Sequence, residues 1–259
     1  AAAYMAYGYS AAGGDIGAAL VVPGPGLLNA AAAVGTAYSA SVPMLLISGQ
    51  IERDFIGKDE GRLHEMVDQL DVIKTVTKWA HRILDPSEIP AAVREAFFQM
   101  QSGRPLPVEI EIPPETLEEE AEIDLLEQVS HLQVSPNETA VTAGAAELVR
   151  AKEPLIWAGE GSLSSGCGAA MIRLAEYLQA PVVCAREAKG AISDRHYLAM
   201  GVPNWLSDPL DDLIDQADVV LAVGASLARS QIRSMQRVVL VDVDAGQPDD
   251  RISAEIIGD

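Results

Sequence analysis

The sequence predicts an α/β protein made of two doubly wound, Rossmann-like units, each built on a parallel sheet. Short apolar runs of strand length alternate with helix-length segments, which is typical of parallel sheets covered by helices on both faces. Near the middle of the chain, the acidic run PETLEEEAEIDLLEQ interrupts this alternation and indicates an exposed, acidic linker. We therefore expect a first unit over residues 1–116, a linker over 117–138 and a second unit over 139–259.

Three apolar runs predict the strands of the first unit, at residues 17–22, 44–49 and 108–112. After the first of them, PGPG at residues 23–26 predicts a turn, because this run can neither continue a strand nor lie inside a helix. The small-residue segment that follows predicts a helix whose backbone approaches its neighbours closely. Residues 88–101 repeat apolar side chains at helical spacing and predict an amphipathic helix.

The second unit shows the same alternation of apolar strands and helices. Its strands are expected at 154–159, 181–185, 218–224 and 238–244. Two helices are expected between them, at 168–179 and 209–216. In an open α/β sheet the turns at the carboxyl ends of the strands are where ligands bind. The turns after these strands are therefore candidate binding sites.

Charge and composition exclude several classes of function. The chain has 38 acidic and 18 basic residues and a formal net charge of −20, which argues against nucleic acid and anionic membranes as partners. No apolar run reaches the ~18–20 residues that span a bilayer, and no signal peptide is recognisable. The two cysteines, Cys167 and Cys184, are too few for a disulfide framework, so we expect a cytoplasmic protein. No two histidines have the spacing of metal ligands.

Several segments, in their order along the chain, resemble one enzyme family. PGPGLLNA followed by AYSASVPMLLISGQ resembles the pyrimidine-binding domain of thiamine-diphosphate enzymes of the acetolactate synthase type. The start, AAAYMAYGYSAAGG, is similar to the helix after the family's catalytic glutamate, and SGRPLPVEIEIP is similar to the strand that closes the domain. From about Glu153 the chain is similar to the family's central domain. The resemblance covers nearly the whole chain.

This resemblance implies part of a thiamine-diphosphate- and magnesium-dependent 2-oxo acid decarboxylase or carboligase. Family members form homodimers or homotetramers, because the cofactor lies between domains of two subunits. The resemblance places the ring-activating glutamate just before Ala1 and the GDG…N motif for diphosphate and magnesium on a third domain. Neither is in this sequence, so we expect the chain alone to be an incomplete, inactive portion of the enzyme. The synthases' VPKD lysine is also absent, which leaves decarboxylase and carboligase equally compatible.

The resemblance also assigns residues to the thiamine site. Pro25, Gly26 and Asn29 match positions beside the pyrimidine ring, and the alternative is that they only shape a helix start. GRLHEMVDQL is similar to the family's FQE segment, with His64 in place of the glutamine. An imidazole there can bind a carboxylate or move protons near neutral pH, which makes His64 the candidate catalytic residue. The alternative is an exposed loop histidine.

A flavin site is a further expectation from the resemblance. The Gly-rich turn GEGSLSSG follows a strand and opens a helix, a setting in which backbone amides meet phosphates. The residues that match FAD contacts of the family are Ser41, Arg104, Gly159, Gly161, Gly224 and Asp242. The chain departs from the family where SLARSQ replaces RFDDR and in the loop after MGVPNWL. Central domains with and without FAD therefore both remain open.

Two rival functions belong to other classes. The first is a flavin- or nicotinamide-nucleotide-binding module without thiamine chemistry, which would depend on the second unit alone. PGPGLLN and SGQ argue against it, because dinucleotide binding does not require them. The second is a non-catalytic regulatory or remnant protein.

Overall fold

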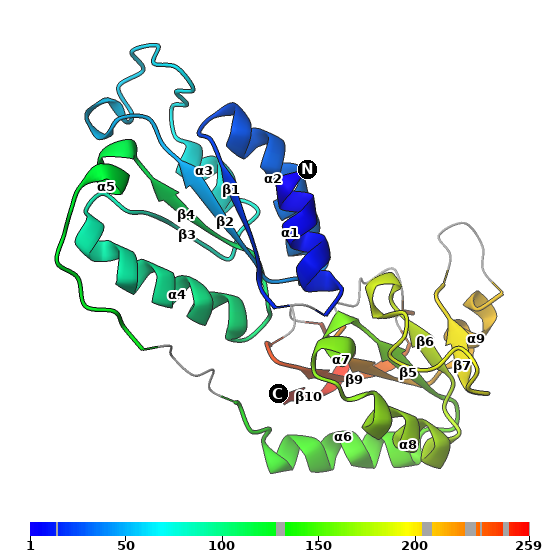
Figure 1. Ribbon diagram of the computed structural model, residues 1–259. Helices are drawn as coiled ribbons and strands as arrows, with labels where there is room; N and C mark the ends of the chain where they lie inside the picture. Colours follow the sequence, from blue (N-terminus) through cyan, green and yellow to red (C-terminus); the bar gives the residue numbers. More distant parts are fainter. Residues whose placement is uncertain are drawn as a thin grey trace. The chain divides into compact units, whose positions relative to one another are not determined.

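The computed structural model describes residues 1–13, 15–127, 133–203, 209–225, 232–233, 235–245 and 249–258. The chain divides into two compact units, Ala1–Leu132 and Gln133–Asp259. Each unit is built on its own parallel sheet with helices on its faces (Figure 1). The predicted α/β class with two parallel-sheet units is therefore confirmed.

The described residues of the first unit form a four-stranded parallel sheet in the order β1-β2-β4-β3. In chain order, with η for a 3-10 helix, its elements are α1 (Ala2–Ala11), β1 (Gly17–Val21), α2 (Pro25–Ser39), β2 (Met44–Gly49), η1 (Arg53–Phe55), α3 (Gln69–Lys74), β3 (Trp79–Arg82), η2 (Pro86–Glu88), α4 (Ile89–Gln101), β4 (Val108–Ile112) and α5 (Pro114–Glu118). Beyond α5, residues 120–127 are exposed and belong to no helix or strand.

Helices cover both faces of this first sheet (Figure 1). On one face, Ala96 and Met100 of α4 pack with Leu45 and Ile110. On the other face, α1, α2 and α3 pack over Leu46 and its neighbours. α2 is rich in alanine, which has the highest helix propensity, and proline occupies its first turn, where the missing N–H removes no helical hydrogen bond.

The described residues of the second unit form a six-stranded parallel sheet in the order β10-β9-β8-β5-β6-β7. In chain order its elements are α6 (Glu138–Arg150), β5 (Pro154–Ala158), α7 (Glu160–Ser164), α8 (Gly168–Leu178), β6 (Val182–Cys184), η3 (Arg186–Ala188), β7 (Ala199–Gly201), α9 (Asp211–Gln216), β8 (Val219–Val223), β9 (Arg237–Asp242) and β10 (Ile252–Ile257). The order of the strands reverses between β5 and β8, so the turns after these two strands lie side by side.

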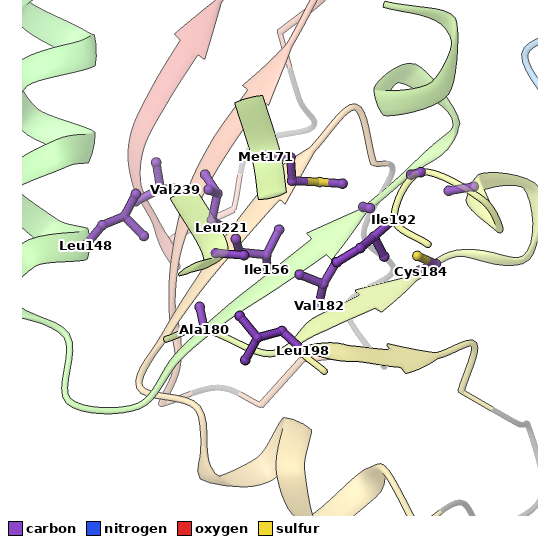
Figure 2. Packing of buried hydrophobic residues seen from close by; sticks show 14 of the residues in the cluster. Leu148, Ile156, Met171, Ala180, Val182, Cys184, Ile192, Leu198, Leu221 and Val239 are labelled. Carbon is purple, nitrogen blue, oxygen red and sulfur yellow. The ribbon is translucent and has the colours of Figure 1, made fainter. Parts of the chain in front are cut away.

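A buried apolar cluster joins this sheet to α6 and α8 (Figure 2). Leu148 of α6 and Met171 of α8 pack in the same cluster as Ile156 and Leu221 of the central strands. Cys184 lies in this cluster as well, and burial raises the pKa of its thiol. Both cysteines are free.

The predicted strands and helices are present, with ends within two residues of those expected. Three described strands were not predicted: β3, β7 and β10. Each is short or carries polar residues among its apolar ones. None of the described helices has both the length and the hydropathy needed to cross a bilayer.

Candidate functional site

The PGPG turn, residues 23–26, joins the end of β1 to the start of α2. Gly24 has a φ of +56°, in the left-handed region that glycine adopts without strain. A Cβ atom at Gly24 would lie 2.3 Å from the carbonyl oxygen of His64. The backbone at residue 64 therefore packs directly against the PGPG turn, and only glycine fits at position 24.

Gln69, the first residue of α3, holds the same turn through its side chain. It is completely buried, and its Oε1 accepts a 2.9 Å hydrogen bond from the Gly24 amide. Its Nε2 donates to the carbonyl oxygen of Gly49 at 2.7 Å and to Ser48 Oγ at 3.2 Å. One side chain thus connects the carboxyl ends of β1 and β2. No pattern in the sequence singles out Gln69.

The three residues expected beside a pyrimidine ring lie at the start of α2. Pro25 and Asn29 are exposed, and Gly26 is half-buried. Pro25 and Asn29 are one helical turn apart, so they share a face of α2. Leu28, which is 50% exposed, adds apolar surface beside them. An exposed amide next to apolar side chains suits a flat heteroaromatic ring with polar edges.

His64 lies on the segment that packs against the PGPG turn. It is half-buried and has a φ of +67°. The Glu65 carboxylate stabilises the backbone of residues 60–62, because it accepts hydrogen bonds from the amides of Glu60 and Arg62. Arg62 in turn pairs with Glu52. The structure therefore brings His64 to the PGPG turn.

Two glutamates of the central strand β4 are completely buried below this turn. Glu109 Oε1 accepts a 2.5 Å hydrogen bond from Ser48 Oγ. Glu111 Oε1 accepts from Gln50 Nε2 at 2.9 Å and also pairs with Arg82. Burial raises the pKa of Glu109 to about 8, so this carboxyl is protonated at neutral pH. Two glutamates within an otherwise apolar strand were the signal in the sequence that we did not use.

Two of the residues matched to flavin contacts contact each other within the first unit. Arg104 Nε donates a 2.7 Å hydrogen bond to Ser41 Oγ. Ser41 lies just after α2 and has a φ of +53°.

The glycines matched to flavin contacts in the second unit lie where the turns after β5 and β8 meet. A Cβ atom at Gly159 would lie 2.1 Å from the carbonyl oxygen of Gly224, and one at Gly161 would lie 2.8 Å from Gly224 Cα. The amide of Gly161 donates to the Gly224 oxygen at 3.0 Å, and that of Gly159 donates to the Val223 oxygen at 2.8 Å. These glycines thus allow two turns to pack closely, and both amides bond within the protein instead of facing a phosphate.

Asp242 ends β9, on the same edge of the sheet, and its Oδ1 accepts from the amide of Val243 at 2.8 Å. SLARSQ and residues 204–208, which include the start of the loop after MGVPNWL, lie outside the described residues. In the part of the chain that the structure describes, no group of three or more His, Cys, Asp or Glu side chains could hold a metal ion.

Comparison with known protein families decides the assignment. Residues 1–72 match the N-terminal TPP-binding domain of thiamine pyrophosphate enzymes, and residues 141–259 match the central domain of the same enzymes. The chain belongs to the thiamine pyrophosphate enzymes. The resemblance seen in the sequence is thereby confirmed.

Curated relatives of this thiamine pyrophosphate enzyme include both decarboxylases and synthases. The chain is 33% identical to a probable 2-ketoarginine decarboxylase of Pseudomonas aeruginosa, over 94% of its own length and 44% of the relative's. It is 29% identical to the acetolactate synthase isozyme 3 large subunit of Escherichia coli, over 100% and 47% of the two lengths. The chain thus spans about half the length of these relatives.

The fold is shared with a solved structure of low sequence identity. The crystal structure of benzoylformate decarboxylase from Polynucleobacter necessarius superposes with a TM-score of 0.82 at 22% identity. The match covers 99% of this chain and 50% of that one.

Proposed function

We propose that the whole protein is a thiamine-diphosphate-dependent enzyme that decarboxylates a 2-oxo acid or transfers the resulting acyl unit to an acceptor. The observation that carries this proposal is the match of residues 1–72 to a TPP-binding domain, since that stretch contains the PGPG turn and His64. The names of the relatives, a decarboxylase and acetolactate synthases, support both reaction types. The rival function, a nucleotide-binding module without thiamine chemistry, gains no support from them.

When bound, thiamine diphosphate supplies a nucleophilic carbon and an electron sink for loss of carbon dioxide from 2-oxo acids. We assign its pyrimidine side to Pro25, Gly26 and Asn29. Pro25 offers apolar surface and Asn29 offers an amide that can donate and accept. Gly26 is required for packing as well, because a Cβ atom there would lie 2.7 Å from a Val22 methyl carbon.

We assign substrate handling to His64. Its backbone contact with Gly24 holds it beside the turn that we give to the cofactor. An imidazole at this place can orient a substrate carboxylate or move a proton near neutral pH.

The proposal also covers the metal ion, the oligomeric state and the location of the protein. We propose magnesium on the cofactor's diphosphate, a homodimer or homotetramer, and a cytoplasmic location, the last because both cysteines are free thiols. Bound FAD stays a prediction with little structural support, because the amides of Gly159 and Gly161 bond within the protein. The absorption spectrum of the purified whole protein tests it, and a colourless preparation that takes up no added FAD would end it.

The whole protein tests the proposed function directly. With thiamine diphosphate and magnesium, we expect carbon dioxide release from at least one member of a panel of short aliphatic, aromatic and guanidino-bearing 2-oxo acids. Omission of thiamine diphosphate should abolish it. Failure of the protein to bind thiamine diphosphate in calorimetry with magnesium present would refute the proposal. Turnover that does not depend on the cofactor would refute it too.

A further inference from the structure

A continuous chain of hydrogen bonds connects a buried carboxyl of the first unit to the PGPG turn. Glu109 Oε1 accepts from Ser48 Oγ at 2.5 Å, and Ser48 Oγ accepts from Gln69 Nε2 at 3.2 Å. Gln69 Oε1 then accepts from the Gly24 amide at 2.9 Å. The three side chains are completely buried and come from β4, β2 and α3. The chain thus spans three elements of the fold.

Glu109 sets the direction of the first bond in this chain, and two backbone groups set the direction of the last. Because Glu109 Oε1 is an acceptor, the Ser48 hydroxyl donates to it and presents a lone pair to Gln69. The Gln69 amide nitrogen faces Ser48 and the Gly49 carbonyl, which can only accept, and its oxygen faces the Gly24 N–H, which can only donate. Without an acceptor at position 109, the Ser48 hydroxyl is free to turn and no longer presents a fixed lone pair to Gln69, so one of the hydrogen bonds that hold the Gln69 side chain in place is weakened.

We propose that the Glu109 carboxyl is a positioning group that, through Ser48 and Gln69, holds the Gly24 amide at the turn where α2 begins. The inference rests on the proposed function, since this is the turn that we assign to the cofactor. Glu109 itself is buried under the sheet's helices, so it acts on the site only through its neighbours.

The surroundings of Glu109 make its positioning of the Gly24 amide depend on pH. Burial is the main cause that raises the pKa of Glu109 to about 8, and the charge of Glu111 adds to it. The Ser48 hydrogen bond and the charge of Arg82 act in the opposite direction. Other titratable groups on or beside the helices that cover this face are Tyr7, Tyr38, Asp68, Asp71 and Lys74.

Ionisation of Glu109 would place a second carboxylate next to Glu111. Among the described residues, neither Glu109 Oε2 nor Glu111 Oε2 has a hydrogen-bond partner. An ionised Glu109 would have one hydrogen-bond donor, Ser48 Oγ, and a second buried oxygen without one, which is unfavourable for a charge. The Ser48 hydrogen bond itself favours the ionised form, but the buried charge gains water in any opening of the turn that exposes Glu109. We therefore expect such an opening of the PGPG turn to become easier as the pH rises through the pKa of Glu109.

Hydrogen exchange of the Gly24 amide in the whole protein tests the inference. A peptide covering residues 21–28 is suited to measure exchange of the Gly24 amide, because Pro23 and Pro25 have no amide hydrogen and few other amides contribute. At a pH below the pKa of Glu109, Glu109→Leu and Ser48→Ala should exchange about tenfold faster than the parent, the effect of one lost hydrogen bond. Glu109→Gln keeps an acceptor oxygen and should match the parent. Glu111→Gln is the control, since it changes the neighbouring carboxyl outside the chain of bonds.

The comparison of the parent with Glu109→Gln also works if Glu109→Leu fails to fold. Above the pKa of Glu109 the parent should exchange faster than Glu109→Gln at the same pH, where the intrinsic exchange rates are equal. Equal exchange of parent and Glu109→Gln at every pH would overturn the inference. So would parent-like exchange in a folded Glu109→Leu protein.

Thiamine diphosphate affinity separates this inference from the proposed function. If the turn serves the cofactor, Ser48→Ala should weaken binding about tenfold, and Glu109→Gln should abolish the parent's loss of affinity at high pH. A parent that binds no thiamine diphosphate refutes the proposed function, while the exchange data still decide whether Glu109 holds the turn. Altered exchange with unchanged affinity would overturn the cofactor part of the inference alone.

Discussion

Arg104 and Ser41 form a side-chain hydrogen bond of 2.7 Å although 63 residues separate them in sequence. The bond connects the segment before β4 to the turn between α2 and β2. Ser41 adopts a φ of +53°, a conformation that disfavours residues with a side chain. The Arg104 bond therefore stabilises a strained position within the first unit.

We predict that Arg104→Ala and Ser41→Ala each lower the free energy of unfolding. The decrease in the double variant should be smaller than the sum of the two single decreases. The coupling should be about 1–1.5 kcal/mol, the value of a hydrogen bond with a charged donor that is partly exposed. Chemical denaturation of the four proteins measures it. Ser41→Gly should lower the free energy of unfolding less than Ser41→Ala, because glycine relieves the backbone strain. Additive losses would mean that the bond does not form in solution.

We predict that stability falls with rising pH because of Glu109. Burial raises its pKa to about 8 in the folded protein, from the ordinary glutamate value of 4.5. Between these values the folded state holds a proton that the unfolded state has lost, so the free energy of unfolding decreases as the pH rises from about 4.5 to about 8. The decrease due to this group is on the order of a few kcal/mol. In Glu109→Gln this decrease should be absent. The free energy of unfolding of both proteins is measured by chemical denaturation at several pH values. The same pH dependence in parent and variant would contradict the prediction.

We predict that Gly24→Ala destabilises the protein much more than Gly57→Ala. Both glycines have positive φ, +56° and +76°, so both substitutions introduce left-handed strain of roughly 1–2 kcal/mol. Only at Gly24 does the new Cβ also collide with a backbone atom, the His64 oxygen, whereas Gly57 has open space. We expect an additional loss of roughly 2 kcal/mol for Gly24→Ala. Thermal unfolding of the two variants measures the difference, and equal melting temperatures would show that segment 61–69 does not pack on the turn.

We predict that Gly161→Ala destabilises the second unit whether or not FAD binds. The new Cβ would lie 2.8 Å from Gly224 Cα, so one of the two turns must move, at a cost of roughly 1–3 kcal/mol. Gly166→Ala is a comparison and not a matched control, because Gly166 has a φ of +66° and no atom within 4 Å, whereas Gly161 does not have a positive φ. It isolates left-handed strain in the same unit. If added FAD shifts the melting temperature of the parent but not that of Gly161→Ala, the turn has a ligand role beyond packing.

We predict that His64→Asn lowers turnover on the 2-oxo acid by roughly tenfold or more while the protein remains folded, since this is the lower range for a single acid–base or orienting group. Asparagine tolerates the positive φ at this position, so the loss reflects the imidazole and not the backbone. His64→Gln restores the residue type of the family and should change the ratio of decarboxylation to carboligation. Unchanged rates and product ratios from mildly acidic to mildly basic pH would leave His64 with a structural role only.

The sequence predicts those parts of the fold that depend on local pattern. The strand β2 was found because it begins as a continuous apolar run, β4 because β-branched apolar residues alternate along it, and the PGPG turn because proline and glycine restrict the backbone. β3 was missed because WAHR is half-buried throughout and mixes apolar and charged residues. The three-residue strand β7 is too short to show any period.

The side-chain hydrogen bonds of the site could not be predicted from local sequence pattern. Gln69 meets Gly24 across 45 residues, and Glu109 meets Ser48 across 61. These pairs are set by strand order and register, which place β2 beside β4. Even so, two glutamates in a strand that must be buried were a visible conflict, and such conflicts are expected at functional or strained positions.

The contact between segment 61–69 and the PGPG turn has an evolutionary consequence. At position 64 the atom that supports the turn is the carbonyl oxygen, which every amino acid possesses. The side chain can therefore be exchanged to suit different substrates while the turn keeps its shape, with glycine, asparagine and aspartate favoured by the local φ. Glycine at position 24 has no such freedom. Selection for new substrates would thus diversify one side of this contact and leave the other invariant.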